Sequence, residues 1–371
     1  MKDLKGKGIY IWIIDEKEDP KDTAQACKAA GLTHAAIKIA DAGYAYNIEY
    51  NTNNGLPWGR DKVPALVAAL RSAGVSPWGW VFVYGNTPDA EADIAIQRSK
   101  TLGIDGLIVN AEGAYKGKFT AAKRYMARIR GELGGKVPIA LSSYRFPDIH
   151  PDFPWVEFLS QVDINMPQVY WMLSHNAGDQ MLRCYEQFLS AKYPQKPIFP
   201  TGAAFSEQSW RPTVAEINEF MTVAEGLGVA GCNFWLYQQA RHRFPEYWQA
   251  ISEYDWPVDH AEDPVVDPVE PLPGDALFWA KCIAAAWLRI RKGPSTGYDT
   301  VDYLPRDAIE AVYEVSGDWW RIGQGWVSSS YMEIITPPVV DPSPEPLSLD
   351  ERVALLEEDV KLLKALHPEV S

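Results

Sequence analysis

The 371-residue sequence predicts an α/β fold of alternating strands and helices, followed by a small all-β module and a short helical tail. Three observations predict this organisation. Eight apolar runs of strand length alternate with helical patterns over residues 1–254. Two stretches rich in proline and acidic residues, 255–275 and 336–347, interrupt the chain. A heptad pattern of apolar residues then occupies 348–367.

The predicted strands of the first unit are continuous apolar runs, which is typical of parallel strands buried on both faces. In chain order they are GIYIWIID (8–15), THAAIKIAD (33–41), SPWGWVFVYG (76–85), DGLIVNAE (105–112), VPIALSSY (137–144), VDINMPQVYW (162–171), PIFPTGAAF (197–205) and AGCNFWLYQQ (230–239).

Helix start and stop signals lie between these runs. A proline or a capping residue opens the helical patterns over 20–31, 61–74, 87–103 and 212–228, and a glycine closes each. Eight such units in about 250 residues have the size and rhythm of a (β/α)8, or TIM, barrel. The main alternative is a doubly wound open sheet, but the GxGxxG turn typical of that fold is absent after the first run.

The module over 276–335 has short strands, tight turns and no helical pattern. Its segments LRIRKGPS (288–295), GDWWRI (317–322) and GWVSSSYM (325–332) follow one another in the order of a bacterial SH3-like domain. The module therefore resembles that family. The resemblance implies a small β-barrel that binds bacterial cell walls or, in other members, serves as a structural adaptor.

The tail has apolar residues at alternating spacings of four and three, and Ser348 with Glu351 forms a capping box at its start. The spacing is seen in Leu349, Val353, Leu356, Val360 and Leu363. We expect residues 348–367 to form a coiled coil that makes the protein a homo-oligomer, a dimer or a trimer. The alternative is a lone amphipathic helix folded back on the barrel.

The net charge of −14 and the lack of a long apolar run argue against nucleic-acid binding and against a membrane span. The segments 255–275 and 336–371 carry −7 and −5, so −12 of the charge lies outside the folded parts. Nucleic-acid binding, which needs a basic surface, is not expected. No uncharged apolar run approaches about 18 residues, so we expect no membrane span. The N-terminus shows no signal-peptide pattern, which predicts synthesis in the cytoplasm.

Four scattered cysteines and six histidines show no spacing typical of a metal site, so we expect neither metal nor cofactor. In a TIM barrel the reacting groups lie at the carboxyl ends of the strands. The residues expected there are Asp15, Lys38, Asp41, Tyr84, Asn110, Glu112, Tyr144, Gln168, Tyr170, Trp171, Trp235 and Tyr237. A rim of carboxylates, phenols, amides and indoles favours a metal-free hydrolase acting on sugars.

Glu112 is the strongest candidate for catalysis. It shares a strand face with Asn110 and stands just before the Gly113 turn at the barrel mouth. A general acid for glycoside cleavage needs a carboxyl group partly shielded from water, and an aromatic mouth could provide the shielding. The alternative is a polar strand-end residue that caps the next helix or pairs with Lys116 or Lys118.

The run DGLIVNAE (105–112) is similar to the D-G-x-x-x-D-x-E strand of chitinase-like (family 18) glycoside hydrolases. Asp105, Gly106 and Glu112 match, whereas Asn110 stands where that family has Asp. If that Asp positions the acid, the departure makes activity weak, altered or absent. Asp15, together with N-A-E, also resembles lysozyme-type (family 25) muramidases. Either resemblance implies a glycoside hydrolase with Glu112 as its acid.

A second carboxylate would lie roughly 5–10 Å from the acid in a two-carboxylate glycosidase. Asp15 is the first candidate and Asp41 the second. If neither serves, the substrate's own N-acetyl group could assist, held by Tyr170 or Gln168. Among the tryptophans that could stack on sugar rings, Trp171 and Trp235 are preferred over Trp78 and Trp80 because they stand at strand ends.

A catalytic barrel joined to an SH3-like module resembles the architecture of phage endolysins and autolysins. We therefore expect a glycoside hydrolase acting on peptidoglycan or a related N-acetylated glycan, at the bacterial cell wall or as a phage-encoded protein. The alternative is a non-catalytic carbohydrate-binding or structural protein whose barrel retains the mouth without the chemistry.

Overall fold

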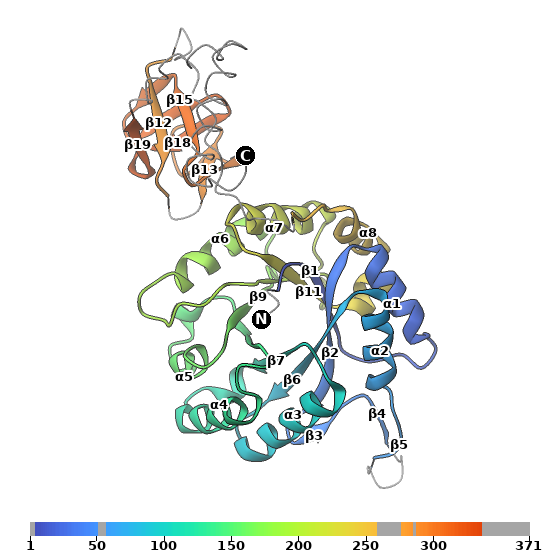
Figure 1. Cartoon of the computed structure of the whole chain (residues 1–371). Coiled ribbons are helices and arrows are strands. Elements are labelled where there is room, and N and C mark those ends of the chain that lie inside the picture. The colour runs from blue at the N-terminus through green and yellow to red at the C-terminus, as the bar shows by residue number, and fades with distance from the viewer. Residues whose placement is uncertain (1–3, 51–56, 258–275, 285–286, 336–371) are drawn as a thin grey trace, which may run out of the picture.

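The computed structural model describes residues 4–50, 57–257, 276–284 and 287–335 (Figure 1). The predicted coiled-coil helix over 348–367 and the second proline-rich stretch lie outside the described residues, as does most of the first stretch. Secondary structure of the first unit runs from Gly6 to Glu253, and that of the second from Phe278 to Ile335.

The first unit is a closed barrel of eight parallel strands. β1 pairs in parallel with both β2 and β11, which closes the ring, and the order around it is β1-β2-β6-β7-β8-β9-β10-β11. The strands are β1 (Gly6–Ile11), β2 (Leu32–Asp41), β6 (Ser76–Val83), β7 (Gly106–Ala111), β8 (Ile139–Tyr144), β9 (Ile164–Val169), β10 (Thr201–Ala203) and β11 (Gly231–Trp235). The predicted TIM barrel is confirmed.

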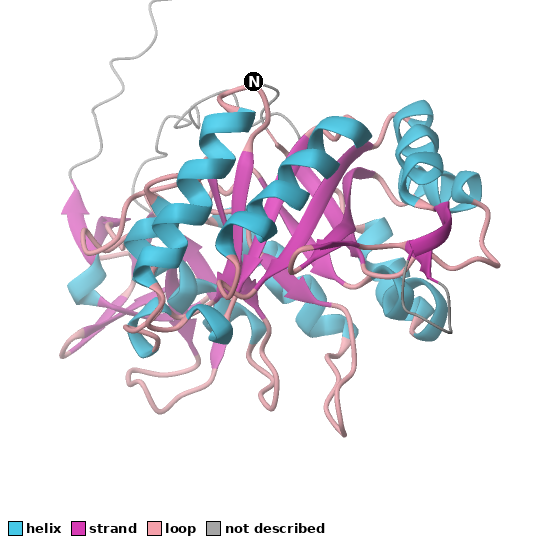
Figure 2. Ribbon diagram, turned by 90° about the horizontal axis from the view of Figure 1, so that it is seen from below, coloured by secondary structure: helices cyan, strands magenta, loops and turns pink. Residues whose placement is uncertain are grey.

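A helix follows each strand and packs on the outside of the barrel (Figure 2). The helices are α1 (Pro20–Ala29), α2 (Val63–Ala73), α3 (Pro88–Leu102), α4 (Phe119–Leu133), α5 (Trp155–Leu159), α6 (Ala177–Phe188), α7 (Val214–Gly226) and α8 (Pro245–Glu253). Pro20 opens α1 as expected, directly after its Asp19 cap, and Gly74 and Gly103 end α2 and α3 in the left-handed conformation. The cap of α2 is Lys62 and not the expected Asp61. Short helical turns η1 (Gly113–Tyr115), η2 (Pro147–Ile149) and η3 (Gln239–Arg243) and strands β3 (Tyr44–Ala45), β4 (Ile48–Tyr50) and β5 (Pro57–Asp61) complete the unit.

Two apolar layers hold the barrel together. The outer layer lies between strands and helices, and the inner layer fills the barrel itself. The inner layer consists of Tyr10, Ala36, Trp78, Trp80, Ile108, Ala140, Met166 and Phe199. Gly106 makes room for this packing, because a Cβ there would lie 2.4 Å from the Trp78 ring. Trp78 and Trp80 are therefore core residues.

Several strands end earlier than the apolar runs suggest. β1 stops at Ile11 and not at Asp15, and β11 stops at Trp235 and not at 239. The segment after Ile11 continues with Trp12 and Ile13, which are 40% and 48% exposed, so its apolar character does not come from strand pairing. This shift decides which side chains reach the barrel mouth.

The second unit contains two antiparallel sheets, β15-β12-β19 and β14-β13-β18-β17-β16, around a small apolar core. Its strands are β12 (Phe278–Cys282), β13 (Trp287–Arg291), β14 (Thr300–Pro305), β15 (Ile309–Val312), β16 (Glu314–Ser316), β17 (Trp319–Ile322), β18 (Gly325–Ser328) and β19 (Met332–Ile335), with a helical turn η4 (Ser329–Tyr331). The expected all-β organisation is confirmed.

The second unit contacts the barrel at helices α6 and α7, beside which it lies in Figure 1. Arg289 Nε lies 2.8 Å from Asp179 Oδ1, and the Tyr303 hydroxyl donates to the same oxygen at 3.3 Å. Trp287 and Tyr303 pack against the barrel's outer apolar layer. A charged pair and two aromatic rings therefore hold the two units together.

Candidate active site

The carboxylate of Glu112 stands at the end of β7 and accepts hydrogen bonds from two neutral amides. Asn110 Nδ2 lies 3.1 Å and Gln168 Nε2 lies 2.9 Å from Glu112 Oε1. Gln168 Nε2 also approaches Asn110 Oδ1 at 2.7 Å and Ser142 Oγ at 3.3 Å. The register of the parallel strands explains this, because Asn110 is level with Ser142 and Tyr144 is level with Gln168. Three predicted site residues are thus brought together.

The structural alternatives for Glu112 do not form. Lys116 pairs with Asp152 at 3.6 Å, and Lys118 Nζ donates to the Tyr84 carbonyl and to Asn86 Oδ1. The Glu112 side chain makes no capping bond to the helical turn that follows it. Within the described parts of the chain, no Lys or Arg side chain forms an ion pair with Glu112.

Three tyrosines surround this carboxylate. Burial raises the pKa of Tyr84, Tyr144 and Tyr170, and the negative charge of Glu112 raises each further. The Tyr170 backbone is held in place by the Arg145 guanidinium, which donates to its carbonyl oxygen. A raised pKa keeps each of these phenols protonated at neutral pH, so each can donate a hydrogen bond.

Lys38 and Asp41 form an ion pair at the end of β2. Lys38 Nζ lies 2.6 Å from Asp41 Oδ2, and it also lies 4.2 Å from the Tyr46 ring centroid and 4.8 Å from that of Trp80. Burial raises the pKa of Tyr84, and the negative charges of Asp41 and Glu112 raise it further. Of the two carboxylates that act on Tyr84, Asp41 is paired with a cation and Glu112 is held by amides.

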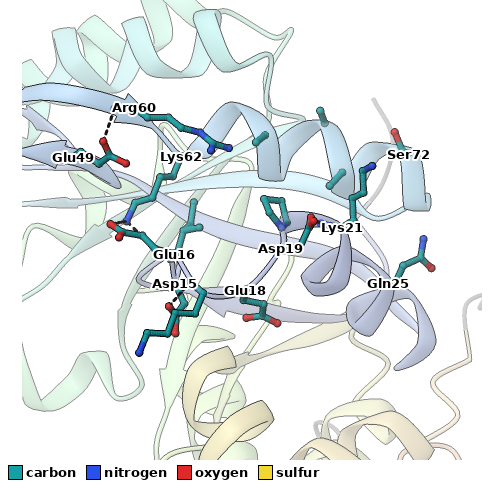
Figure 3. A pocket seen from close by; sticks show the side chains of 16 residues that line it. Asp15, Glu16, Glu18, Asp19, Lys21, Gln25, Glu49, Arg60, Lys62 and Ser72 are labelled. Atoms are coloured by element: carbon teal, nitrogen blue, oxygen red, sulfur yellow. Dashed lines mark hydrogen bonds and ion pairs between the residues drawn. The ribbon is translucent and has the colours of Figure 1, made fainter.

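Asp15, the first candidate for a second carboxylate, does not join this group. It lies four positions beyond the end of β1, is exposed, and accepts a hydrogen bond from the Lys17 backbone N–H at 2.9 Å. It lines a pocket that also involves α1 and α2 (Figure 3). None of the contacts among the described residues links Asp15 to Glu112. The expectation placed Asp15 on the strand because the apolar run continues past Ile11.

Trp235, at the end of β11, is half-buried beside the mouth. Its ring centroid lies 5.4 Å from Trp80, 5.6 Å from Tyr10 and 6.0 Å from Trp12. Trp12 is 40% exposed and was not anticipated as a site residue. The period-two alternation from Tyr10 indicates Trp12 once the strand end is placed at Ile11.

Two expected substrate contacts lie elsewhere. Trp171 is fully buried and packs between Phe220 and Trp210, so neither face of its ring is open to a sugar. It follows Tyr170 directly and therefore points to the other side of the chain. Tyr237 lies beyond the end of β11, is buried, and donates its hydroxyl proton to Glu18 Oε1 at 2.5 Å. Both expectations are corrected.

Across the described residues, no group of three or more His, Cys, Asp or Glu side chains is arranged to hold a metal ion. All four cysteines are buried and free, and burial raises their pKa. None of the described helices is long and apolar enough to cross a membrane.

Comparison with known proteins finds a family match within the second unit. Residues 287–333 match the bacterial SH3 domain family, and the second unit is a bacterial SH3 domain. No curated protein sequence matches the chain. The protein thus combines a (β/α)8 barrel with a bacterial SH3 domain.

Solved structures similar to the barrel include three bacterial enzymes. A chitinase from Bacteroides thetaiotaomicron shares 9% identity and a TM-score of 0.50, over 67% of this chain and 96% of that one. A GH18 chitinase from Pseudoalteromonas aurantia shares 14% identity, with a TM-score of 0.48 over 67% and 98%. The spore cortex-lytic enzyme SleL of Bacillus cereus shares 9% identity, with a TM-score of 0.48 over 67% of this chain and 73% of that one. At such identities the likeness shows the barrel fold alone.

Proposed function

We propose that this protein is a glycoside hydrolase that acts on an N-acetylated glycan of the bacterial cell wall, with Glu112 as its general acid. The observation that carries the proposal is the environment of Glu112, a half-buried carboxylate held by the amides of Asn110 and Gln168 and surrounded by phenols. A carboxyl group that is unpaired with a cation can donate a proton to, or accept one from, a substrate bound beside it. The bacterial SH3 domain supports a target at the cell wall.

In the proposed reaction Glu112 donates its proton to the glycosidic oxygen as the bond from that oxygen to the anomeric carbon breaks. Asn110 and Gln168 orient the carboxyl group, and Ser142 lies within reach of the same Gln168 amide. Trp235 and Trp12 offer aromatic surface at the mouth on which a sugar ring can stack. No metal or cofactor takes part in this scheme.

The group that supports the anomeric carbon is, in our proposal, the substrate's own N-acetyl carbonyl oxygen. Among the described residues, the groups bonded to Glu112 are hydrogen-bond donors, and neither candidate for a second carboxylate is free beside it, since Asp15 lies apart and Asp41 is paired with Lys38. In this proposal Tyr170 holds the N-acetyl group. The carbonyl oxygen of that group attacks the anomeric carbon, and the product is a cyclic oxazolinium ion. Water then opens this ion and gives its proton back to Glu112, which completes the cycle.

The test is release of reducing sugar from purified peptidoglycan and from chitin oligomers, comparing the native protein with Glu112→Gln. The substitution keeps an acceptor for both amides and removes the transferable proton, so the rate should fall about 10²- to 10⁴-fold. Glu132→Gln, which changes an exposed carboxylate on α4, is the matched control and should leave the rate unchanged. Full activity of Glu112→Gln would remove Glu112 from the proposed role.

A second candidate function is non-catalytic glycan binding. Asn110 favours it, because it stands where chitinase-like enzymes have Asp and because it donates its amide to Glu112. In that case neither protein would release sugar, and both would co-sediment with cell walls. The same experiment therefore separates the two functions.

A further inference from the structure

A pocket of about 850 Å³ lies at the edge of the barrel, formed by the loop after β1, by α1 and α2, and by the base of the β4–β5 hairpin (Figure 3). All barrel strands are parallel, so the loop after β1 and the hairpin after β2 lie at the end of the barrel that carries Glu112. The pocket and the proposed catalytic group therefore share one end of the molecule while using different residues.

The carboxylates that line the pocket are already bonded within the protein. Asp15 accepts from the Lys17 backbone N–H, Glu16 from Lys62 Nζ, Glu18 from Tyr237 and His242, Asp19 from the Lys21 backbone N–H, and Glu49 from the Arg60 backbone N–H. These bonds shape the loop and the hairpin base, so the acids serve as supports of the pocket wall.

Three cations of the pocket, in contrast, are unused. The side chains of Lys17, Lys21 and Arg60 form no hydrogen bond or ion pair with any residue in the described ranges. Figure 3 shows Lys21, from α1, and Arg60, from β5, on different sides of the pocket. Unpaired cations on two walls of a pocket are complementary to a ligand with more than one carboxylate.

The residues that line the pocket are poorly suited to two other kinds of ligand, sugars and phosphate polymers. The lining contains no aromatic ring on which a sugar could stack, in contrast to the mouth with Trp12 and Trp235. The exposed acids Asp15 and Glu16, the latter with 70% of its side chain exposed, add negative charge beside the cations, so a ligand that carries both signs of charge suits the pocket better than a polymer of phosphates. A short peptide that carries carboxylates and an amino group fits both signs of charge.

We propose that this pocket binds the carboxylate-bearing peptide branches of a cell-wall glycan while the sugar backbone lies at the barrel mouth. The inference rests on the proposed function and extends it, because it makes a peptide-substituted glycan, and not bare chitin, the substrate of the protein. Lys21 and Arg60 are the residues assigned to contact the peptide carboxylates.

The experiment measures binding of the synthetic peptide L-Ala-γ-D-Glu-L-Lys-D-Ala, and of the same peptide with both carboxylates amidated, to the full chain by calorimetry. We expect the amidated peptide to bind at least ten-fold more weakly. The double variant Lys21→Glu/Arg60→Glu should lose at least ten-fold in affinity for the acid form. Lys28→Glu/Lys136→Glu makes the same change of charge outside the pocket and should bind as the native protein does.

Each other result overturns the inference. If Lys21→Glu/Arg60→Glu binds like the native protein, the peptide binds elsewhere, for example on the SH3 domain. If both double variants weaken binding equally, net charge and not the pocket is responsible. If glycerol-phosphate oligomers bind and the peptide does not, the pocket accepts phosphate.

Hydrolysis distinguishes this inference from the proposed function. Intact peptidoglycan and the same material stripped of peptides by an amidase serve as the two substrates. Faster cleavage of the intact form, lost in Lys21→Glu/Arg60→Glu, supports both proposals. Equal cleavage of both substrates overturns the peptide site and leaves the hydrolase standing. Peptide binding without any cleavage overturns the hydrolase and leaves the peptide site standing.

Discussion

Gln168 Nε2 lies 2.9 Å from Glu112 Oε1 and 2.7 Å from Asn110 Oδ1, so one amide from β9 connects both polar residues at the end of β7. The two strands are separated by β8, whose Ser142 lies 3.3 Å from the same nitrogen. Gln168 is therefore the residue that fixes the carboxyl group of Glu112 relative to the rest of the mouth.

Gln168→Leu removes this amide while keeping a side chain of similar volume. If Glu112 is the acid, its carboxyl group loses a neutral donor and turns more freely, so kcat should fall about ten- to hundred-fold, with a smaller change in KM. The measurement is steady-state hydrolysis of a glycan oligomer. Gln97→Leu, on the exposed face of α3, is the control and should retain native kinetics. Equal kcat for Gln168→Leu and the native enzyme would contradict the role of Gln168.

Buried Glu91 organises another part of the mouth. Its side chain, 1% exposed, accepts hydrogen bonds from four successive backbone N–H groups, those of residues 84 to 87, at 2.9 to 3.2 Å. These residues form the loop that carries Tyr84. In Glu91→Gln, a side-chain N–H₂ replaces one acceptor and faces backbone donors.

Because buried donors are then left unsatisfied, Glu91→Gln should lower the free energy of unfolding by about 2–3 kcal/mol. Urea unfolding of the full chain measures it. Asp93→Asn, on the same helix, breaks an exposed pair with Arg128 and should cost less than about 1 kcal/mol. If the two variants are equally stable, the loop does not depend on Glu91.

The sequence predicts part of this mouth and misses the rest for identifiable reasons. Period-two alternation along one strand is enough to place Asn110 beside Glu112, and the same rule on another strand gives Gln168 and Tyr170. It also implies that Trp171 turns outward into the helix layer, where it packs on Phe220. What alternation cannot supply is the point at which a strand stops.

Strand ends depend on pairing with neighbours, and an apolar run can continue without it. The run through Trp12 and Ile13 leaves the barrel after Ile11, which carries Asp15 away from Glu112. Contacts between distant elements are likewise not visible in the sequence. The four backbone hydrogen bonds to Glu91 and the ion pair of Arg289 with Asp179 each depend on tertiary packing.

Gly226, the last residue of α7, lies directly against Trp287 of the SH3 domain. A Cβ at this position would lie 1.2 Å from Trp287 Cζ2. Within a helix, alanine is by itself more favourable than glycine by about 1 kcal/mol. Gly226→Ala should therefore leave the barrel folded and displace the Trp287 ring. The expected result is an increased radius of gyration in small-angle X-ray scattering, with an unchanged circular dichroism spectrum.

Gly228→Ala does not serve as a control here, because Gly228 has φ of +70° and a side chain there is strained. Gly131→Ala, in the last turn of α4, is suitable, since no atom lies within 4 Å of the added Cβ. Scattering curves that coincide for Gly226→Ala and Gly131→Ala would show that Trp287 does not hold the two units together.

His34 makes the barrel sensitive to acid. Its ring is fully buried, with Nε2 2.6 Å from Asn233 Oδ1, and burial lowers its pKa to about 4 from an ordinary value of 6.5, an effect that the Asn233 bond partly offsets. Between these two values the unfolded chain binds a proton that the folded chain does not. The contribution of His34 to the free energy of unfolding is therefore highest above pH 6.5 and falls as the pH drops toward 4.

At about 1.4 kcal/mol per pH unit, His34 should lower the free energy of unfolding by about 2 kcal/mol at pH 5 and about 3 kcal/mol at pH 4. Urea unfolding at pH 7, 6, 5 and 4.5 measures the loss, and His34→Gln, which can still donate to Asn233, removes the titrating group. The variant starts less stable at pH 7, because an amide fills the site of the imidazole less well. Between pH 7 and pH 5, the free energy of unfolding of His34→Gln should fall by about 2 kcal/mol less than that of the native protein. Parallel curves for the two proteins would mean that other groups cause the acid sensitivity.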